Sequence, residues 1–364
     1  MSDLTKELLK LIKEEKTINQ ISQTLNLSNK QIYNILTMIK NKGFDFERKY
    51  YDTGDIIYVP RTTPITNTQE GTNIITDKSS DTYTAIVVSD MHFGSGFEVE
   101  GIMDKIYDYC VKEGIHNIIC CGDLLDGTRS QQEQRIPDTM EQIDYLLRNY
   151  PFDKNILTFT VLGDHDRSIL KGTGQDISFV LNSYRHDIVP LGYRIGNLNI
   201  KNDTLTIEHQ SNLRKDKINS NLTLRGHYHS SKISYTSNVC KVDIPSLSNL
   251  NLYNEDGTTS IIKIPEAYLM KIKFNTNTLS YICLNQLFIL DKIYPINETC
   301  FQIASKKKGD FNNTEDYSKT ILKNHPNLQD LNPHLTLQPP VYVPPTPKNP
   351  ASLDNIRKKT HKWE

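Results

Sequence analysis

Short apolar runs that end in ionisable residues recur through the middle of this chain. Their β-branched and aromatic residues favour strands, and glycine or serine stands at most of the points where a run ends. The runs and their endings are residues 85–88 with Asp90 and His92, 118–121 with Asp123 and Asp126, 155–162 with Asp164, His165 and Asp166, 205–208 with His209, and 222–225 with His227 and His229. Open α/β sheets bind ligands outside the carboxyl ends of their strands. Residues 163–166 alone could be an ordinary polar turn. The repetition of the pattern at five strand ends favours a functional site instead.

Helical patterns separate the first three runs. Apolar residues recur at helical spacing from Val99 to Cys110 and from Met140 to Leu147. Strand, helix, strand, helix, strand is the order of a layered α/β unit. After Asn182 strand patterns prevail, at residues 242–245, 261–264 and 268–274. We expect these to form a second, largely antiparallel sheet, so the fold class is α/β with two sheets.

The first 60 residues carry a different pattern. Apolar positions predict three helices, and the second and third open with capping-box spacings, Thr17 with Gln20 and Ser28 with Gln31. Two short strand patterns then flank a turn at residues 52–55. Three helices followed by a hairpin resemble a winged helix-turn-helix.

The third predicted helix is basic. No acidic residue lies between Asn29 and Gly43, and the cations there are Lys30, Lys40 and Lys42. Polar groups that could add contacts are Asn29, Gln31, Tyr33 and Asn34. Such a helix is compatible with the major groove of DNA. The alternative is a small helical domain that docks onto another protein or onto the enzyme itself.

Changes in composition divide the chain into four parts. Residues 1–60 form the helical module, and residues 61–82, rich in Thr, Asn, Ser and Asp, are interpreted as a linker. Residues 83–292 contain the strand-end motifs. Residues 293–364 are polar and Pro-rich with a basic end, which predicts an extended tail that is either a solvated linker or a partner-binding segment.

Charge and cysteine use narrow the class of protein. The chain has 42 Lys+Arg and 43 Asp+Glu, so no global charge attracts it to nucleic acid or membrane. Its six cysteines include no C-x-x-C pair, and Cys120 and Cys121 lie in an apolar run, which favours buried free thiols over disulfides or a zinc site. No apolar signal core opens the chain, and no run approaches the ~20 apolar residues of a membrane span. We expect a soluble, cytoplasmic protein.

In order and content the strand-end motifs resemble those of the calcineurin-like metallophosphoesterase superfamily. The family's motifs run Asp-x-His, Gly-Asp-x-x-Asp, Gly-Asn-His-Asp/Glu, a lone His and Gly-His-x-His, and the resemblance extends from Tyr83 to Leu290. It implies a two-sheet sandwich flanked by helices and a site for two divalent metals. The implied ligands are Asp90, His92 and His229 for the first metal, Asp164, His209 and His227 for the second, and Asp123 as the bridge.

Two divalent metals would suit the hydrolysis of a phosphate ester. They neutralise charge on the phosphoryl oxygens and lower the pKa of a bound water, and they take hard oxygens and imidazoles as ligands. We expect Mn²⁺, with Fe, Zn and Mg as alternatives. By the resemblance, metal-bound hydroxide attacks phosphorus, His165 acts as the acid, and Asp166 orients and charges His165.

Other polar residues near the motifs have alternative roles. Asp126 could cap a helix or hydrogen-bond a ligand. Arg129, Arg135 and Arg167 are candidate phosphate contacts, although exposed arginines are usually solvated charges. Asp164 stands where the family has Asn. The extra negative charge should tighten metal binding and weaken the attraction for phosphate.

Three functions fit these motifs. The first is a phosphodiesterase or nuclease acting on DNA or RNA, with the N-terminal module delivering the site to its substrate. The second is a phosphomonoesterase for protein or small molecules, in which the module only docks. The third, a non-catalytic DNA-binding or scaffold protein, is disfavoured because every ligand position holds a competent residue. The oligomeric state is left open.

Overall fold

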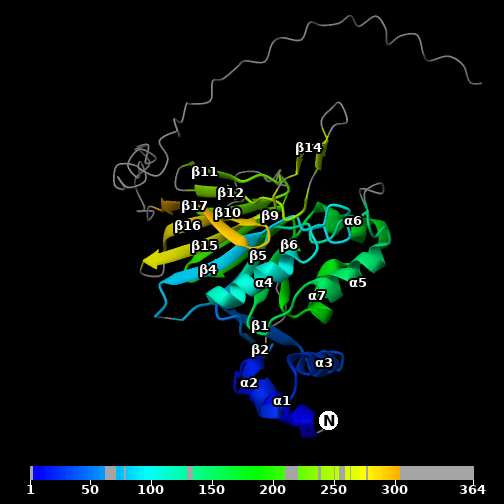
Figure 1. The fold of residues 1–364 in the computed structure, drawn as a ribbon. Helices are drawn as coiled ribbons and strands as arrows, with labels where there is room; N and C mark the ends of the chain where they lie inside the picture. The colour runs from blue at the N-terminus through cyan, green and yellow to red at the C-terminus, as the bar shows by residue number, and fades with distance from the viewer. Residues whose placement is uncertain are drawn as a thin grey trace, which may run out of the picture. The chain divides into compact units, whose positions relative to one another are not determined.

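The computed structural model describes residues 3–61, 71–77, 79–128, 134–209, 220–236, 239–249, 251–253, 259–262, 264–275 and 278–303 (Figure 1). All of these belong to one compact unit, residues 1–308. None of the described helices is long and apolar enough to cross a lipid bilayer.

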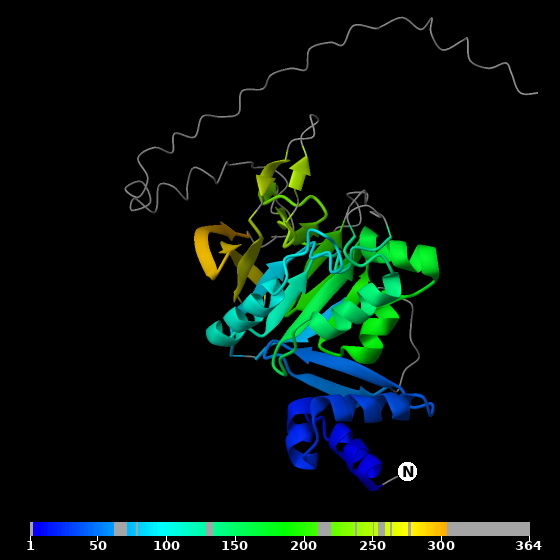
Figure 2. The same cartoon turned by 45° about the vertical axis from the view of Figure 1, so that its right-hand side comes forward.

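Two large sheets form the body of the described structure (Figure 2). The seven-stranded sheet has the order β17 (Ile293–Gln302), β16 (Thr278–Ile289), β15 (Glu266–Asn275), β4 (Thr82–Val88), β5 (Asn117–Cys120), β6 (Leu157–Leu162), β7 (Ile188–Tyr193). The eight-stranded sheet has the order β11 (Lys232–Thr236), β12 (Val239–Asp243), β10 (Leu222–Gly226), β9 (Asp203–His209), β8 (Ile195–Ile200), β3 (Thr72–Ile75), β1 (Phe46–Tyr51), β2 (Ile56–Pro60). A separate hairpin joins β13 (Asn251–Tyr253) to β14 (Thr259–Ile262).

The parallel strands β4, β5 and β6 of the seven-stranded sheet are largely buried on both faces. Side chains alternate along these strands: Val87 and Ile119 enter the core between the sheets, whereas Ile86 and Ile118 pack under the helices. Those helices are α4 (Ile102–Glu113), α5 (Thr139–Asn149), α6 (Asp164–Thr173) and α7 (Ile177–Tyr184). Burial on both sides explains why these strands read as continuous apolar runs. The expected α/β sandwich of two sheets flanked by helices is confirmed.

The second sheet differs from the expectation. It is mixed, because β9 and β10, β10 and β12, β3 and β8, and β1 and β3 all pair in parallel. Residues 268–274 do not belong to it, since β15 pairs with β4 in the other sheet. A strand pattern predicts a strand but not its partner, which is set by contacts far away in sequence.

The N-terminal module has the expected elements. Its helices are α1 (Asp3–Lys13), α2 (Ile18–Leu25) and α3 (Asn29–Lys40), and the hairpin β1–β2 follows. Both capping boxes form, at Thr17 and at Ser28. The winged helix-turn-helix identity stays a prediction.

The module is continuous with the sheet beside it. Part of the expected linker, residues 72–75, is strand β3, which pairs with β1 on one side and β8 on the other. Tyr50 of the hairpin packs edge-on against Phe159 of β6, with ring centroids 5.6 Å apart. Leu8 and Ile32 belong to the same apolar core as the two sheets. A flexible connection between separable domains is therefore the wrong description of residues 71–77.

Polar contacts add to this packing. His186, in the turn before β7, accepts or donates a hydrogen bond with the Tyr58 hydroxyl at 2.7 Å and stacks on Tyr33 with centroids 4.2 Å apart. Gly54, at the hairpin turn, lies so near Asn155 that a Cβ there would sit 1.9 Å from its carbonyl oxygen. The module is thus fitted closely to the sheet domain.

Two further expectations need correction. Cys283 and Cys300 face each other on β16 and β17 and form a disulfide, whereas Cys110, Cys120, Cys121 and Cys240 are buried free thiols as expected. The expected tail begins with an ordered strand, β17, because its residues pair with β16. Residues 304–364 lie outside the described residues.

The contact at His186 predicts a pH dependence of stability. Burial, helped by the nearby cations Arg48 and Lys40, lowers the pKa of His186 to about 3. An unfolded histidine titrates near about 6.5, so between these values the unfolded chain binds a proton that the folded chain does not. The contribution of His186 to the free energy of unfolding is therefore complete above about pH 6.5. It is lost as the pH falls toward 3, by up to about 1.4 kcal/mol per pH unit.

We expect the free energy of unfolding of the wild type, measured by denaturant titration in EDTA, to exceed that of His186→Gln near pH 7. The difference should shrink steadily as the pH is lowered. Effects of other titrating groups cancel in this comparison. A difference that stays constant from pH 7 to 4 would show that His186 is not buried as a neutral ring.

Candidate metal centre

Five strands bring their carboxyl ends to one edge of the two sheets. Asp90 and His92 follow β4, Asp123 follows β5, and Asp164 follows β6 in the seven-stranded sheet. In the facing sheet His209 ends β9, and His227 and His229 follow β10. Neighbouring parallel strands end side by side, so the fold brings all seven of these side chains together.

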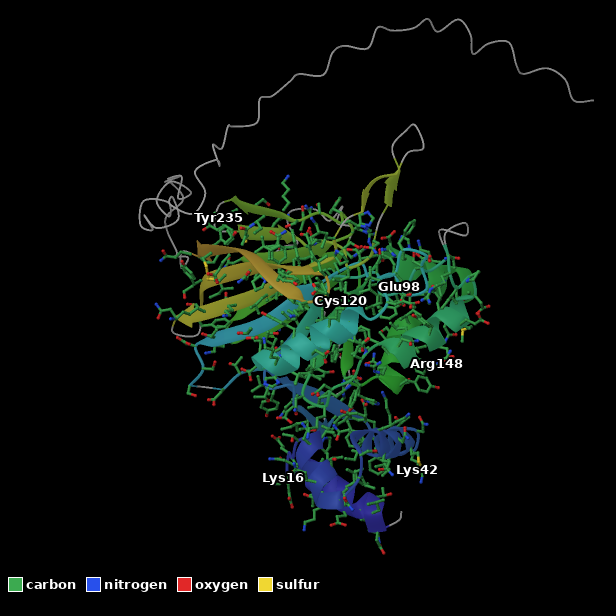
Figure 3. All side chains as sticks on the ribbon, in the orientation of Figure 1. Lys16, Lys42, Glu98, Cys120, Arg148 and Tyr235 are labelled. Carbon is green, nitrogen blue, oxygen red and sulfur yellow. A yellow bond between two sulfur atoms is a disulfide. The ribbon has the colours of Figure 1, made fainter. Side chains whose placement is uncertain are left out.

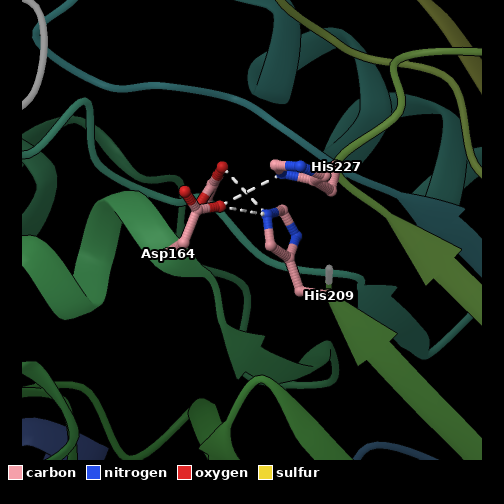
Figure 4. A group of neighbouring side chains, drawn as sticks. Asp164, His209 and His227 are labelled. Carbon is pink, nitrogen blue, oxygen red and sulfur yellow. Dashed lines mark hydrogen bonds and ion pairs between the residues drawn. The ribbon is translucent and has the colours of Figure 1, made fainter. Parts of the chain in front are cut away.

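The seven side chains form two groups of possible metal ligands. One group is Asp123, Asp164, His209 and His227, and the other is Asp90, His92 and His229, with the ligand atoms of each group within 4.8 Å of one another. Figure 4 shows Asp164 with the two imidazoles that it contacts, His209 Nε2 and His227 Nδ1, each 3.1 Å from Asp164 Oδ1. In the second group His229 Nε2 lies 3.0 Å from Asp90 Oδ1.

Asp123, a member of the first group, also lies near the second. Its Oδ2 lies 3.0 Å from His209 Nε2 and 4.0 Å from His92 Nε2. Adjacent ligands of an ion at about 2.1 Å are about 3 Å apart in octahedral geometry, which is the spacing seen here. The donors, carboxylate oxygens and imidazoles, are those that hard and borderline divalent cations take.

The metal centre is buried on all sides but one. Asp90, Asp123, Asp164 and His209 are at most 4% exposed. The side chains of His227 and His229 are 29% and 20% exposed. The Gly226–His229 loop therefore forms the rim through which a substrate could approach.

The backbone is strained where these ligands stand. Positive φ angles of 49–80° occur at Asp90, His92, Asp123, His227 and His229. Residues other than glycine rarely adopt this left-handed conformation, and such strain gathers at functional sites. The segments that carry Asp90 and His92, and His227 and His229, are therefore not extended strands at these positions.

Close backbone approach requires glycine at two points. A Cβ on Gly163 would lie 2.0 Å from Asp123 Oδ1, and one on Gly226 would lie 2.3 Å from the carbonyl oxygen of Cys121. Any side chain at Gly163 would therefore displace the carboxylate that stands between the two groups.

Hydrogen bonds and charge orient the imidazoles. The His209 Nδ1 bonds the carbonyl oxygen of Cys121 at 2.7 Å, which turns Nε2 toward Asp123 and Asp164, and these carboxylates raise the pKa of His209 against the opposing effect of burial. Burial lowers the pKa of His92 to about 4. Neither ring nitrogen of His92 makes a hydrogen bond within the described part of the chain. Buried nitrogen atoms normally have partners, so this orphaned ring fits a metal ligand.

His165 lies beside the second group without joining it. Its Nδ1 bonds the carbonyl oxygen of Asp126 at 2.6 Å, and its backbone N–H donates to Asp123 Oδ1 at 3.0 Å. Burial opposes protonation of the ring, but Asp123 and the Asp126 carbonyl outweigh it and raise the pKa of His165. The Asp126 carboxylate lies 3.7 Å from His92 Nδ1.

A family model agrees with this arrangement. The model for calcineurin-like phosphoesterases matches residues 83–269, more than half of the chain. The chain belongs to this family. It is a metal-dependent phosphoester hydrolase, and the sequence resemblance is confirmed.

The solved structures that match this phosphoesterase differ widely from it in sequence. Vacuolar protein sorting 29 from Cryptosporidium parvum is 12% identical over 60% of this chain and 97% of its own, with a TM-score of 0.37. YfcE, a phosphoesterase from E. coli, is 14% identical over 61% and 100%, with a TM-score of 0.36. The nuclease MPE from Pseudomonas putida is 18% identical over 51% and 84%, with a TM-score of 0.30. Comparison with curated proteins found no significant match.

Asp166 does not orient His165 in this phosphoesterase, contrary to the sequence argument. Its carboxylate accepts the backbone N–H groups of Leu124 at 3.2 Å, Leu125 at 2.9 Å and Gly163 at 2.8 Å. Burial and the Asp123 carboxylate raise the pKa of Asp166 to about 7, while the three N–H groups oppose that rise. Asp166 therefore clamps the loops after β5 and β6 together.

The candidate arginines separate into three cases. Arg135 pairs with Glu98 at 2.7 Å and Glu100 at 2.5 Å, so it is not a free phosphate contact. Arg129 lies outside the described residues. Arg167 is half-buried on α6, two residues after His165, and its role as a phosphate contact stays a prediction.

The three candidate lysines lie far from the metal centre. Lys30, Lys40 and Lys42 are exposed on the module, where Figure 3 labels Lys42. The module contacts Asn155 just before β6, whereas Asp164 follows the end of that strand. Six residues of strand span about 20 Å. Of the polar residues expected to contact DNA, Tyr33 stacks on His186 and Asn29 bonds Asn19.

Tyr228 stands between two ligand candidates and was not predicted from the sequence to have a role. It is 47% exposed, and Arg225 lies over its ring at 4.6 Å from the centroid. The sequence feature that could have identified Tyr228 is its position as the variable residue of the Gly-His-x-His motif.

The contacts of Asp166 predict a loss of stability on truncation. Asp166→Ala leaves three buried N–H groups without an acceptor, and each such group costs about 1–3 kcal/mol. We expect the metal-free variant to lose at least about 2 kcal/mol in denaturant titration, taking the low end because the loops can relax. Asp108→Ala, an exposed residue of α4, is the control and should stay within about 0.5 kcal/mol. Unchanged stability with reduced turnover would favour the orienting role instead.

Proposed function

We propose that this phosphoesterase holds two divalent ions and hydrolyses phosphodiesters of nucleic acid. One observation supports the proposal that two ions bind. Two ligand groups lie on either side of the single carboxylate of Asp123, whose Oδ2 is within 3.0 and 4.0 Å of an imidazole from each. Asp90, His92 and His229 would hold one ion, Asp164, His209 and His227 the other, and Asp123 would bridge them.

The chain's own residues would divide the remaining work. Bound divalent ions, with Mn²⁺ our proposal, would neutralise charge on the phosphoryl oxygens and lower the pKa of a bound water. His165 would serve as acid or hydrogen-bond donor to the leaving oxygen. The Asp126 carbonyl fixes its Nδ1 at 2.6 Å, which leaves Nε2 for the substrate. Cys121 and Asp166 would hold the ligand loops in place through their contacts with His209 and the backbone.

Metal analysis tests the ligand assignment. Protein saturated with Mn²⁺ and freed of excess ion should contain close to two ions per chain. His209→Ala should lose one, because His209 Nε2 faces both Asp123 and Asp164. His116→Ala, which alters a histidine before β5 at the other end of that strand, is the matched control and should keep both. One ion or fewer in the saturated wild type would contradict the two-metal assignment.

Turnover tests the role of His165. His165→Asn should cut turnover roughly 10²- to 10⁴-fold, the usual worth of a general acid or base, and should leave the metal content unchanged. Hydrolysis of a chromogenic diester at saturating Mn²⁺, with metal analysis of the same sample, measures both. Joint loss of metal and activity would make His165 a ligand.

Nucleic acid is the proposed substrate because of the module's basic helix. Lys30, Lys40 and Lys42 are exposed on or just after α3, and no acidic side chain lies among residues 29–43. Such a surface suits the phosphates of a duplex. Since the module contacts the starts of the strands, it would anchor DNA at a distance from the centre rather than place the bound segment in it.

A phosphomonoesterase is the second candidate, and the packing of the module favours it. Tyr33 faces His186, and Gly54 fits against Asn155, which is what a docking module requires. A module used in this way needs no affinity for DNA.

A substrate panel with Mn²⁺ separates the two candidates. We expect bis-p-nitrophenyl phosphate and single- or double-stranded DNA to be hydrolysed in preference to p-nitrophenyl phosphate. Replacing Lys30, Lys40 and Lys42 with Ala in the full chain should weaken duplex binding and leave chromogenic diester hydrolysis unchanged. The salt slope of duplex binding should fall by about 0.9 for each phosphate that the variant no longer neutralises. No duplex binding even at low salt, with the monoester preferred, would support the phosphomonoesterase.

A further inference from the structure

An aromatic side chain stands at the rim of the metal centre with no part in holding it. Tyr228 lies between His227 and His229, and 47% of the residue is exposed. Its ring meets the His227 ring edge-on, at 5.4 Å between centroids and 79° between planes. A group bound at the centre would therefore have Tyr228 as a neighbour.

The side chain of Arg225 packs on the Tyr228 ring. The Arg225 guanidinium lies over the ring, 4.6 Å from its centroid, and Arg225 Nε donates to Asp243 Oδ1 at 2.6 Å. Strand register puts Glu208, Arg225 and Asp243 side by side on β9, β10 and β12. The cation is thus held by Asp243, with the charge of Glu208 on the other neighbouring strand adding attraction, and it covers one face of the tyrosine.

The backbone on both sides of Tyr228 is constrained. His227 and His229 have φ angles of 80° and 49°. The His227 N–H also donates to Asp90 Oδ2 at 3.1 Å. A tyrosine has only two side-chain torsions, so a ring held in this way loses little entropy when a ligand stacks on it.

We propose that Tyr228, backed by Arg225, is a stacking platform for the nucleobase attached to the scissile phosphate. The proposal rests on the phosphodiesterase function above and names its specificity residue. Every base presents a π-face, so a stacking contact of this kind selects nucleotides over other phosphate esters without reading sequence. Base–aromatic stacking is worth about 1–3 kcal/mol, which corresponds to about 5- to 150-fold in affinity.

Binding to the Mn²⁺-loaded full chain, measured by calorimetry, tests the platform independently of turnover. Thymidine 5′-monophosphate should bind more tightly than 2-deoxyribose 5-phosphate, which lacks the base. Tyr228→Ala should weaken binding of the nucleotide about 5- to 150-fold and leave the sugar phosphate unchanged. Tyr228→Phe should retain nucleotide binding. Tyr184→Ala removes an exposed tyrosine at the end of α7 and is the matched control.

Several outcomes would overturn the platform. Equal affinity of the wild type for the two ligands would do so, as would equal weakening of both in Tyr228→Ala. O-phosphotyrosine that binds as tightly as the nucleotide, with the same dependence on Tyr228, would assign the platform to a phosphoprotein. If base-selective binding is found but no diester is hydrolysed, the proposed function fails and the platform stands. If diesters are hydrolysed without base selectivity, the platform alone fails.

Discussion

Three buried carboxylates meet at one sheet edge, and much of the fold serves to hold them there. Asp90, Asp123 and Asp164 are nearly inaccessible to water, and like charges at such short range repel strongly in a poorly screened interior. Of the four imidazoles that lie against them, His209, whose pKa these carboxylates raise, offsets part of that charge. The negative charge that remains explains why divalent cations suit the centre, since each ion neutralises two negative charges without a proton being bound.

Holding these groups against their repulsion requires rigid loops. The clamp of Asp166 on three backbone N–H groups ties the loop after β5 to the start of α6. The Cys121 carbonyl fixes the His209 ring. Left-handed backbone at five of the candidate ligands adds strain that the surrounding sheets must offset. Stability of the two sheets is thus coupled to the geometry of the centre.

The sequence predicted the parts of the fold that local pattern determines. Apolar runs identified the strands around the centre, and the residues that end them proved to be neighbours because parallel strands end at a common edge. The capping boxes of α2 and α3 were equally local and were predicted correctly. What local pattern does not contain is the partner of each strand. The pairing of β15 with β4 and the strand at residues 72–75 depend on residues far away in sequence. The opposition of Cys283 and Cys300 depends on the register between the consecutive strands β16 and β17. The role of Asp166 escaped prediction because two of its three partners, Leu124 and Leu125, lie 42 and 41 residues earlier in the chain.

The place of β3 between β1 and β8 has a consequence for how the protein is made. The hairpin β1–β2 leaves the ribosome early, but the strand that completes the sheet beside it, β8, begins only at Ile195. Until then β3, whose other edge pairs with β1, presents unpaired backbone groups, and an open strand edge of this kind invites association with other chains. Pairings between distant segments also form slowly. The N-terminal module can therefore bury its last edge only after more than half of the chain has been synthesised, and crowded nascent chains would be most prone to aggregate in that interval.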